Sequence, residues 1–186
     1  MEREITIKED GKILVLSDIH YPYCDINLLN NIVEKEKPSL TVLLGDIVVK
    51  GEIKELLGVF KKRSRVIYVR GDEDVQDGDT ELLRVFHNGR KYIFLHGHQY
   101  FNEKSEYSFV KLLMRINKRL PPFLFCLFFR ILLHESGTLI LGHSHALVFF
   151  KSLNCANAGT LTTLSNLYHD LGYITINDNA IDIRKL

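Results

Sequence analysis

The stretch KILVLSDIH, residues 12–20, places an unbroken apolar run directly before an aspartate and a histidine. Consecutive apolar residues bounded by polar ones are typical of a short strand that is buried on both faces. Two later stretches repeat this arrangement, because LTVLLGD at 40–46 and RVIYVRGD at 65–72 each run into an aspartate. We therefore predict three strands that carry polar side chains at their carboxyl ends.

The segments between these runs have the periodicity of helices. DINLLNNIVEKEK follows the first run and GEIKELLGVFKK follows the second, and their apolar residues recur every three or four positions. The order strand, helix, strand, helix, strand implies a parallel sheet. Ligands of such sheets bind just beyond the carboxyl ends of the strands, where this sequence has Asp18, His20, Asp46 and Asp72.

The second half of the chain changes its pattern. LLRVFHNGRKYIFLHGH, residues 82–98, predicts two strands joined by the turn Asn88-Gly89, which is a strong hairpin signal. Later strand-like runs are TLILGHSH, ALVFFKS, YITIN and AIDIRKL, the last two joined around Asp178-Asn179. We expect all of these runs to extend a second, antiparallel-leaning sheet.

The polar residues at the predicted strand ends form five short motifs. They are Asp18-x-His20, Gly45-Asp46, Gly71-Asp72, His96-Gly-His98 and Gly142-His143-x-His145. A single histidine near a strand end is more often a hydrogen-bonded structural residue than a ligand, but five such motifs together are hard to explain by packing alone. Carboxylates and imidazoles are the ligands that a pair of divalent transition-metal ions needs.

This set of motifs resembles the calcineurin-like metallophosphoesterases, whose pattern runs D-x-H, GD, GN[H]D, H and GHxH. Four of the five blocks are intact here as DIH, GD, HGH and GHSH, and the similarity extends from Lys12 to the NAG at 157–159. The chain looks most like the smallest members, among them compact phosphodiesterases and the retromer scaffold subunit. The resemblance implies an α/β fold: a four-layer αββα sandwich with a mixed parallel first sheet, an antiparallel-leaning second sheet and a helical insertion.

The resemblance also implies a ligand set. Asp18, His20 and His145 would hold one metal ion, while Asp72, His96 and His143 would hold the other, with Asp46 bridging the two. Manganese is the first choice, and iron, zinc, cobalt and nickel accept the same mixture of ligands. Of the two histidines in HGH, we choose His96 as the ligand, while His98 is either a contact to the substrate or a structural residue.

The turn GDED, residues 71–74, departs from the family pattern. Asp72 replaces an asparagine ligand, which keeps an oxygen donor, and Glu73 replaces a histidine that protonates the leaving group in many members. We assign catalytic roles to Asp46, Asp72, Glu73 and His98, with a solvated acidic turn as the alternative for Glu73. Asp74 is expected to be structural or to lie outside the metal ligands.

The segment between HGH and GHSH is longer than in the smallest family members. Residues 105–136 read as two helices broken at Pro121-Pro122 and inserted beside the metals. Lys111, Arg115, Lys118 and Arg119 precede an apolar run at 123–133, so that residues 111–133 suit a lipid or a membrane surface. The apolar run is interpreted first as a helix of the domain core or as a homodimer seam, and the lipid or membrane surface is the alternative.

Composition restricts the remaining possibilities. The 24 lysines and arginines nearly balance the 23 aspartates and glutamates, so bulk charge gives no strong nucleic-acid signal. The charged start MEREITIKEDGK lacks the apolar core of an export signal, which predicts a cytoplasmic protein, with peripheral membrane contact as a possibility left open. Cys24, Cys126 and Cys155 lie far apart and are expected to be ordinary thiols.

We therefore expect one domain over residues 1–186, within the usual size of a single domain. Its predicted function is metal-dependent hydrolysis of a phosphodiester or pyrophosphate bond, on a phosphate ester that is nucleotide- or lipid-linked. Phosphodiesters are expected in preference to phosphomonoesters. The alternative is a scaffold of the same fold that is catalytically weak or inactive and binds protein partners.

Overall fold

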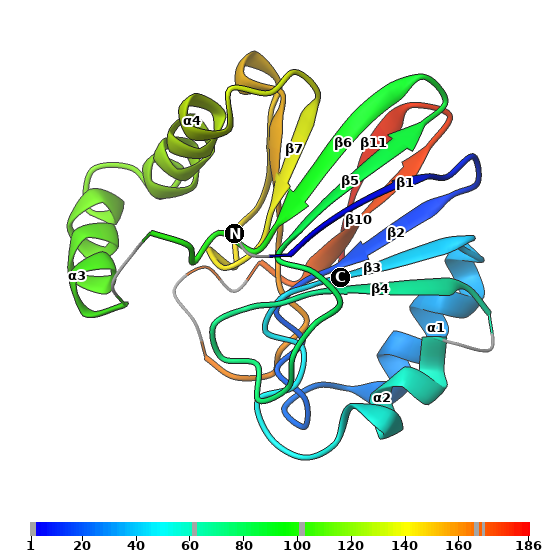
Figure 1. Ribbon diagram of the computed structural model, residues 1–186. Coiled ribbons are helices and arrows are strands. Elements are labelled where there is room, and N and C mark those ends of the chain that lie inside the picture. Colours follow the sequence, from blue (N-terminus) through cyan, green and yellow to red (C-terminus); the bar gives the residue numbers. More distant parts are fainter. Residues whose placement is uncertain (1–2, 61–62, 101–102, 166–167, 169) are drawn as a thin grey trace.

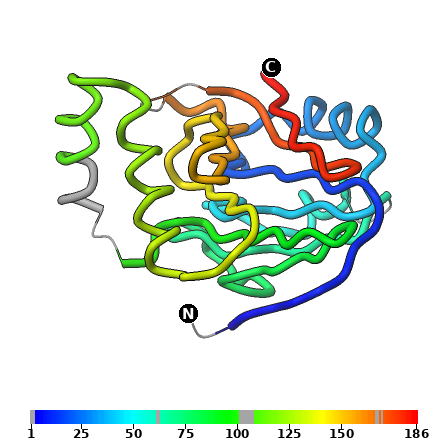
Figure 2. Tube along the Cα trace, turned by 90° about the horizontal axis from the view of Figure 1, so that it is seen from above, coloured from blue at the N-terminus to red at the C-terminus, as the bar shows by residue number. Residues whose placement is uncertain are grey.

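The strands of this protein form two sheets that pack face to face, with helices on both outer faces (Figure 1). The computed structural model describes residues 3–60, 63–100, 103–165, 168 and 170–186. Figure 2 shows the helices of residues 103–133 and the helix of residues 26–36 on opposite sides of the strands. This arrangement confirms the predicted α/β class, with the helix, sheet, sheet, helix order of layers.

The first sheet has the strand order β11-β10-β2-β3-β4. Its strands are β2 (Ile13–Leu16), β3 (Leu40–Leu44), β4 (Arg65–Val69), β10 (Gly172–Asn177) and β11 (Ala180–Lys185). The strands β2, β3 and β4 are parallel, as the alternation with helices predicts. Every residue of β2 and β3 is buried, which explains their unbroken apolar runs.

Two helices cover the outer face of the first sheet, α1 (Ile26–Glu36) and α2 (Ile53–Phe60) (Figure 1). The carboxylate of Asp25 caps α1 by accepting hydrogen bonds from the backbone N–H groups of Asn27 (2.9 Å) and Leu28 (3.1 Å). The helix ends at Lys37, whose φ of 47° is left-handed. Each helix connects two neighbouring parallel strands, α1 leading from β2 to β3 and α2 from β3 to β4.

The second sheet has the order β1-β5-β6-β7-β9-β8 and is also mixed. Its strands are β1 (Glu4–Lys8), β5 (Leu82–His87), β6 (Arg90–Leu95), β7 (Thr138–Leu141), β8 (Leu147–Phe150) and β9 (Cys155–Ala158). The pairs β5–β6 and β8–β9 are antiparallel, while β1–β5, β6–β7 and β7–β9 are parallel. The predicted hairpin at Asn88-Gly89 is confirmed, and both residues have positive φ.

The last hairpin was assigned to the wrong sheet by the sequence pattern. β10 and β11 are joined at Asp178-Asn179, as predicted, but they pair with β2 and extend the first sheet. Val15 of β2 is the register partner of Ile174. The reason is that the apolar side chains of β10 fill the core between the sheets, and local alternation does not say which strand is the neighbour.

The main hydrophobic core lies between the two sheets. It is formed by alternating residues of both, including Val42 and Ile174 from the first sheet and Val85, Phe94 and Ile140 from the second. Both sheets are anchored in this core. The carboxyl ends of β2, β3 and β4 from the first sheet and of β6 and β7 from the second therefore lie at the same edge of the molecule. The site described below is built at that edge.

Two further helices, α3 (Glu103–Met114) and α4 (Leu120–Leu133), lie between β6 and β7 in the chain. α4 packs on the second sheet through Cys126 and Phe129, and α3 packs on α4 (Figure 1). The break between them lies at residues 115–119, before the prolines and not at them, because Pro121 and Pro122 occupy the first turn of α4, where proline is tolerated. No helix within the described ranges is long and apolar enough to cross a membrane.

The cysteines differ from expectation. Cys126 of α4 and Cys155 of β9 form a disulfide across 29 positions of sequence, and Cys24 is a free thiol. The interpretation of Cys126 and Cys155 as ordinary thiols was therefore wrong. Sequence spacing could not reveal this pair, because the two residues meet only when α4 lies on the second sheet.

Candidate metal centre

The predicted ligands lie at the ends of strands from both sheets. Asp18 and His20 follow β2, Asp46 follows β3 and Asp72 follows β4. The second sheet contributes His96 after β6, and both His143 and His145 after β7. The carboxylates thus come from the first sheet and most of the imidazoles from the second, so the site is a junction between the two.

The backbone at these positions is strained. Asp18, His20, Asp46, His143 and His145 all have left-handed φ values between 51° and 59°. Each such residue costs on the order of 1–3 kcal/mol unless the surroundings hold it in place. Residues of this kind gather at functional sites, which supports a role for this edge that goes beyond packing.

Two glycines are required by close approach of the site's own side chains. A Cβ atom on Gly45 would lie 2.1 Å from Nδ1 of His96, and one on Gly71 would lie 2.2 Å from Oδ1 of Asp46. Any larger residue at these places would therefore displace a candidate ligand. The two glycines therefore leave room for neighbouring candidate ligands.

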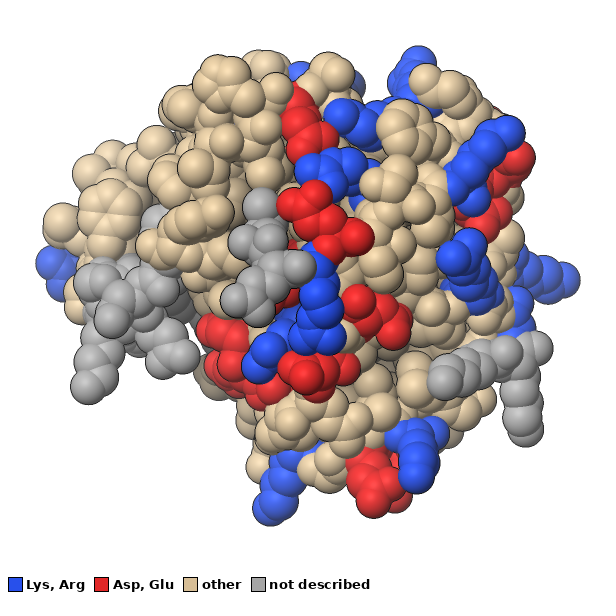
Figure 3. Space-filling model, in the orientation of Figure 1, with Lys and Arg blue, Asp and Glu red and all other residues tan. Residues whose placement is uncertain are grey.

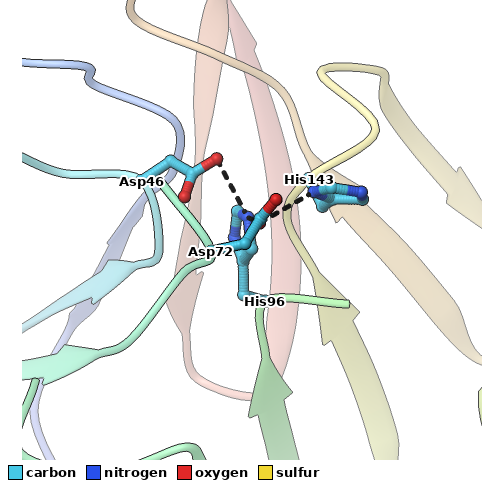
Figure 4. A group of neighbouring side chains, drawn as sticks. All are labelled: Asp46, Asp72, His96 and His143. Atoms are coloured by element: carbon cyan, nitrogen blue, oxygen red, sulfur yellow. Dashed lines mark ion pairs between the residues drawn. The ribbon is translucent and has the colours of Figure 1, made fainter. Parts of the chain in front are cut away.

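The first cluster contains Asp46, Asp72, His96 and His143 (Figure 4). Nε2 of His96 lies 3.2 Å from Oδ2 of Asp46 and 3.2 Å from Oδ1 of Asp72. Nδ1 of His143 lies 3.3 Å from the same oxygen of Asp72. The ligand atoms of this cluster are all within 4.8 Å of one another, a spacing that suits one shared cation.

The second cluster contains Asp18, His20 and His145. Nε2 of His145 lies 3.2 Å from Oδ1 of Asp18, and Nε2 of His20 lies 4.0 Å from that oxygen. Nε2 of His20 is also 4.0 Å from Oδ2 of Asp46, the oxygen that faces His96. Asp46 therefore stands between the two clusters, where a bridging ligand would have to be.

Hydrogen bonds orient the candidate ligands. Nδ1 of His96 lies 3.0 Å from the carbonyl oxygen of Leu44, so this nitrogen carries the proton and Nε2 presents its lone pair to the carboxylates. Oδ2 of Asp18 accepts from the hydroxyl of Ser17 and from the backbone N–H of His143 at 3.2 Å. These bonds leave Oδ1 of Asp18 turned toward the imidazoles.

Asp74 binds two loops together. Its Oδ2 accepts hydrogen bonds from the backbone N–H groups of Asp46 (2.9 Å) and Gly71 (2.7 Å). Its Oδ1 accepts from Ile47 (2.7 Å) and Val48 (2.9 Å). The loops after β3 and β4 are thus fixed to each other, which confirms the structural role expected for Asp74 and places Asp46 beside the turn that carries Asp72.

The residues present fit a metal pair. Oδ1 of Asp18 and Nε2 of both His20 and His96 are buried and have no hydrogen-bond partner within the described part of the chain. Leaving such atoms unpaired is costly, and a cation satisfies carboxylate oxygens and imidazole nitrogens at once. Carboxylate and imidazole together suit manganese, iron and zinc.

The electrostatics of the site favour ionised carboxylates. Burial would raise the pKa of Asp18, but the neighbouring His145 and the hydroxyl of Ser17 lower it to about 2. Burial would also raise the pKa of Asp72, but the neighbouring imidazoles of His143 and His96 hold it well below its usual range. Burial lowers the pKa of His96 by itself, but Asp46 and Asp72 raise it. The cluster therefore holds negative charge ready for a cation.

His98 lies at the margin of the clusters, whereas Glu73 forms a third candidate ligand group with His20 and Asp46. Nδ1 of His98 is 3.8 Å from Oδ1 of Asp72, and His98 belongs to none of the ligand groups found among the described residues. Burial and the nearby His96 lower the pKa of His98 to about 4, so it is neutral at pH 7. Oε2 of Glu73 lies 3.4 Å from Nδ1 of His20, and its side chain is 55% exposed.

All seven predicted ligands are therefore brought together at one edge of the molecule, and their roles as ligands remain a prediction. Sequence reasoning missed Ser17, whose hydroxyl also lies 2.8 Å from the carbonyl oxygen of Leu44. Its position directly before Asp18 was the only available signal. The four hydrogen bonds to Asp74 were likewise not foreseeable, since they depend on how two loops meet in space.

The comparisons with known proteins identify the family of the chain. A family model described as the calcineurin-like phosphoesterase superfamily domain matches residues 12–177. The chain therefore belongs to the calcineurin-like phosphoesterase superfamily. A comparison with curated proteins found no match.

Solved structures share the fold. Yfce, a phosphoesterase from E. coli, is 16% identical with a TM-score of 0.58, and the match covers 92% of this chain and 91% of that one. Vps29 from Chaetomium thermophilum is 17% identical with a TM-score of 0.63, covering 94% and 96%. Vps29 from Entamoeba histolytica, complexed with Zn²⁺, is 17% identical with a TM-score of 0.60, covering 94% and 98%. At these identities the likeness concerns the fold alone.

Proposed function

We propose that this protein is a dinuclear metal-dependent hydrolase of phosphodiester or pyrophosphate bonds. The observation that carries the proposal is the pair of ligand clusters that meet at Asp46, on strained backbone at the joint edge of two sheets. Asp18, His20 and His145 would hold one ion and Asp72, His96 and His143 the other. Manganese is the first candidate, and iron, zinc, cobalt and nickel suit the same ligands.

When bound, two such ions activate a water molecule and polarise the phosphoryl oxygens of the substrate. The protein's own residues do the positioning. Asp46, held by the N–H of Glu73 at 2.9 Å and by Asp74, keeps both clusters in register. Neutral His98, beside Asp72, can donate a hydrogen bond to a phosphoryl oxygen without adding charge.

Charge balance supports diesters over monoesters. Asp18, Asp46, Asp72 and Glu73 carry four negative charges at the site, which offset the four positive charges of two divalent ions. A site without net positive charge gains little from the second negative charge of a phosphomonoester, whereas a diester carries only one. Glu73 also occupies the sequence position at which many family members have a histidine that protonates the leaving group, and a carboxylate is a poor acid at pH 7.

The first test compares two chromogenic substrates. Bis-p-nitrophenyl phosphate and p-nitrophenyl phosphate are offered with added Mn²⁺ to the wild type and to Asp46→Asn. We expect cleavage of the diester by the wild type and a loss of at least about a hundredfold in Asp46→Asn, because the shared ligand is lost. Diester cleavage that survives in Asp46→Asn, or that needs no metal, would contradict the proposal.

The second test addresses Glu73. Glu73→Gln removes one negative charge with little change of shape, and Glu73→His restores a potential acid. Both variants should raise the ratio of monoester to diester turnover, by about tenfold or more for Glu73→His, given the usual range of general acid catalysis. An unchanged ratio in both variants, with metal content equal to the wild type, would mean that Glu73 is a solvated residue without a catalytic role.

The alternative function is a scaffold that keeps the fold and binds protein partners. The observation in its favour is the likeness to Vps29, of which one solved structure holds a cyclic peptide. The complete set of candidate ligands favours the enzyme. Failure to cleave either substrate, with two bound ions confirmed by elemental analysis, would favour the scaffold.

Three finer predictions belong to this proposal. One is a single domain over residues 1–186, with residues 105–136 as an insertion. Another is that the protein is cytoplasmic and contacts the surface of a membrane. The third concerns residues 111–133, for which the sequence left a core helix, a homodimer seam and a lipid contact as competing interpretations.

A further inference from the structure

We propose that the outward face of the helical pair α3/α4 binds the surface of membranes that contain anionic lipids. This surface contact is separate from hydrolysis at the metal centre and can be tested without it. It rests on two observations, the exposed apolar side chains of the pair and the distribution of charge around them.

The apolar side chains form one stripe on each helix. Phe109, Leu112 and Ile116 are exposed and recur at intervals of three and four residues along α3 and the turn that follows it. On α4 the exposed apolar residues are Phe128 and, three and four positions after it, Ile131 and Leu132. At about 100° of rotation per residue, a stripe with this spacing stays on one side of its helix.

Apart from Phe128, whose ring packs on Phe129 and Tyr100, the stripes point away from the protein's own core. α4 turns Cys126 and Phe129 toward the second sheet, and Ile131 lies on the opposite side of that helix. Ile116 is 75% exposed and Ile131 is 60% exposed. Contiguous apolar surface of this kind is unusual on a monomer and marks a contact site. Figure 3 shows the surface over α4 as almost free of charged side chains.

Charge decides among the occupants of this surface. The sequence has no aspartate or glutamate from Tyr107 to His134. Arg115, Lys118 and Arg119 are exposed in the connection between the helices, and no ion pair to them occurs within the described part of the chain. The next acid, Glu135, is already paired with Arg84 and Lys91. The surface is therefore apolar with an uncompensated cationic border.

A second copy of the chain fits this surface poorly. A twofold dimer requires a patch that is complementary to itself, and residues 107–134, which carry the stripes and the cations, contain no carboxylate. The acids of α3, Glu103 and Glu106, lie at the far end of that helix from the basic connection. An anionic bilayer supplies both needed features, because its acyl region accepts the apolar side chains and its headgroups attract lysine and arginine. The basic connection and the apolar stripes then act at the same surface.

The test is sedimentation of the full-length protein with vesicles. Vesicles of phosphatidylcholine alone are compared with vesicles that also contain phosphatidylglycerol, at low and high salt. We expect binding to the anionic vesicles only, weakened by salt because the cations act through surface potential. Absence of binding to anionic vesicles, or equal binding to both kinds, would overturn the proposal.

Variants locate the contact. Replacing Arg115, Lys118 and Arg119 together by Gln should weaken partitioning on the order of a hundredfold, at about fivefold for each cation. Ile116→Glu and Ile131→Glu should each abolish binding to anionic vesicles. Leu186→Glu is the matched control, since Leu186 is 52% exposed but lies outside the pair, and it should bind like the wild type. Circular dichroism checks that all variants are folded.

Two outcomes would reassign the surface. If analytical ultracentrifugation shows a dimer that Ile131→Glu converts to a monomer, while vesicles bind neither form, the surface is a seam between copies and the proposal is wrong. If the Glu variants bind vesicles as well as the wild type does, the contact lies elsewhere and the proposal is equally wrong.

Discussion

Asp74 shows how much a residue outside the ligand set can matter at the scale of a single side chain. Its carboxylate accepts four backbone hydrogen bonds from the loops that carry Asp46 and Asp72. A carboxylate is the only side chain of this size with two acceptor oxygens, each with two lone pairs. The geometry of the whole centre therefore depends on an acid that binds no metal in our proposal.

The substitution Asp74→Asn tests this dependence. The amide keeps one acceptor oxygen and turns an NH₂ group toward two buried N–H donors, so two hydrogen bonds are lost. We expect the free energy of unfolding to fall by about 3 kcal/mol, measured by urea denaturation. Asp182→Asn is the control, because Asp182 is exposed and its ion pair among the described residues is with the neighbouring Arg184. A loss below about 0.5 kcal/mol in Asp74→Asn would contradict this account.

The sequence was sufficient to select the candidate ligands but not the hydrogen bonds that orient them. Each candidate ligand follows an apolar strand in a short motif, so the seven could be selected by reading strand ends. The contact of His96 with the carbonyl of Leu44 and the double contact of Ser17 join elements that are far apart in the chain. No local pattern encodes such contacts, because they depend on the packing of one sheet against the other.

At the scale of elements, Glu135 connects the segment between α4 and β7 to the strands β5 and β6. Just after α4 it pairs with Arg84 of β5 and Lys91 of β6, and Lys91 lies 2.9 Å away. Hydrogen bonds from Arg84, followed by the contact with Lys91, lower the pKa of Glu135 from 4.5 to about 2. The ionised form is thus the one that the fold stabilises.

This shift predicts a pH-dependent effect of Glu135→Gln. A carboxyl group whose pKa is lowered on folding contributes stability above its unfolded pKa and loses it as the pH falls toward the folded value. We expect Glu135→Gln to reduce the free energy of unfolding by about 2 kcal/mol at pH 7, and by less at pH 3. Urea denaturation at both values measures this. Glu34→Gln, which breaks an exposed pair with Arg63, should cost below about 1 kcal/mol.

The disulfide between Cys126 and Cys155 is a second link between elements, since it fastens α4 to β9. Denatured protein that has not been reduced should show only the thiol of Cys24, and full reduction should expose all three cysteines. A loop of this length predicts that reduction lowers the free energy of unfolding by about 3–4 kcal/mol. Titration with Ellman's reagent decides the matter, because three thiols without reductant would mean that no disulfide forms.

The elements themselves were largely predictable, but the partners of the strands were not. β2, β3 and β4 follow from unbroken apolar runs, and the turn at Asn88-Gly89 follows from residues that tolerate positive φ. The sheet that receives β10 depends on contacts with residues about 160 positions away, such as that between Val15 and Ile174. The alternation of apolar and polar residues shows which face of a strand is buried, but it does not show which strand lies beside it.

At the scale of the whole molecule, the proposed ions would join two sheets that otherwise meet through apolar contacts. Metal that binds only the folded state stabilises it by mass action, by about 4 kcal/mol at a thousandfold excess over the dissociation constant. We expect EDTA to lower the melting temperature of the wild type and added Mn²⁺ to restore it. Asp46→Asn should lose this response and Asp182→Asn should keep it. A melting temperature unchanged by EDTA, in protein shown to contain metal beforehand, would contradict the proposed centre.

The spread of the ligands along the chain has a consequence for biosynthesis. Asp18 leaves the ribosome early, whereas His143 and His145 follow well over a hundred residues later. Neither cluster is complete until the second sheet has formed against the first. Metal acquisition would therefore be a late event in the life of each new chain, and a nascent chain arrested before His143 would expose carboxylates that no ion could yet neutralise.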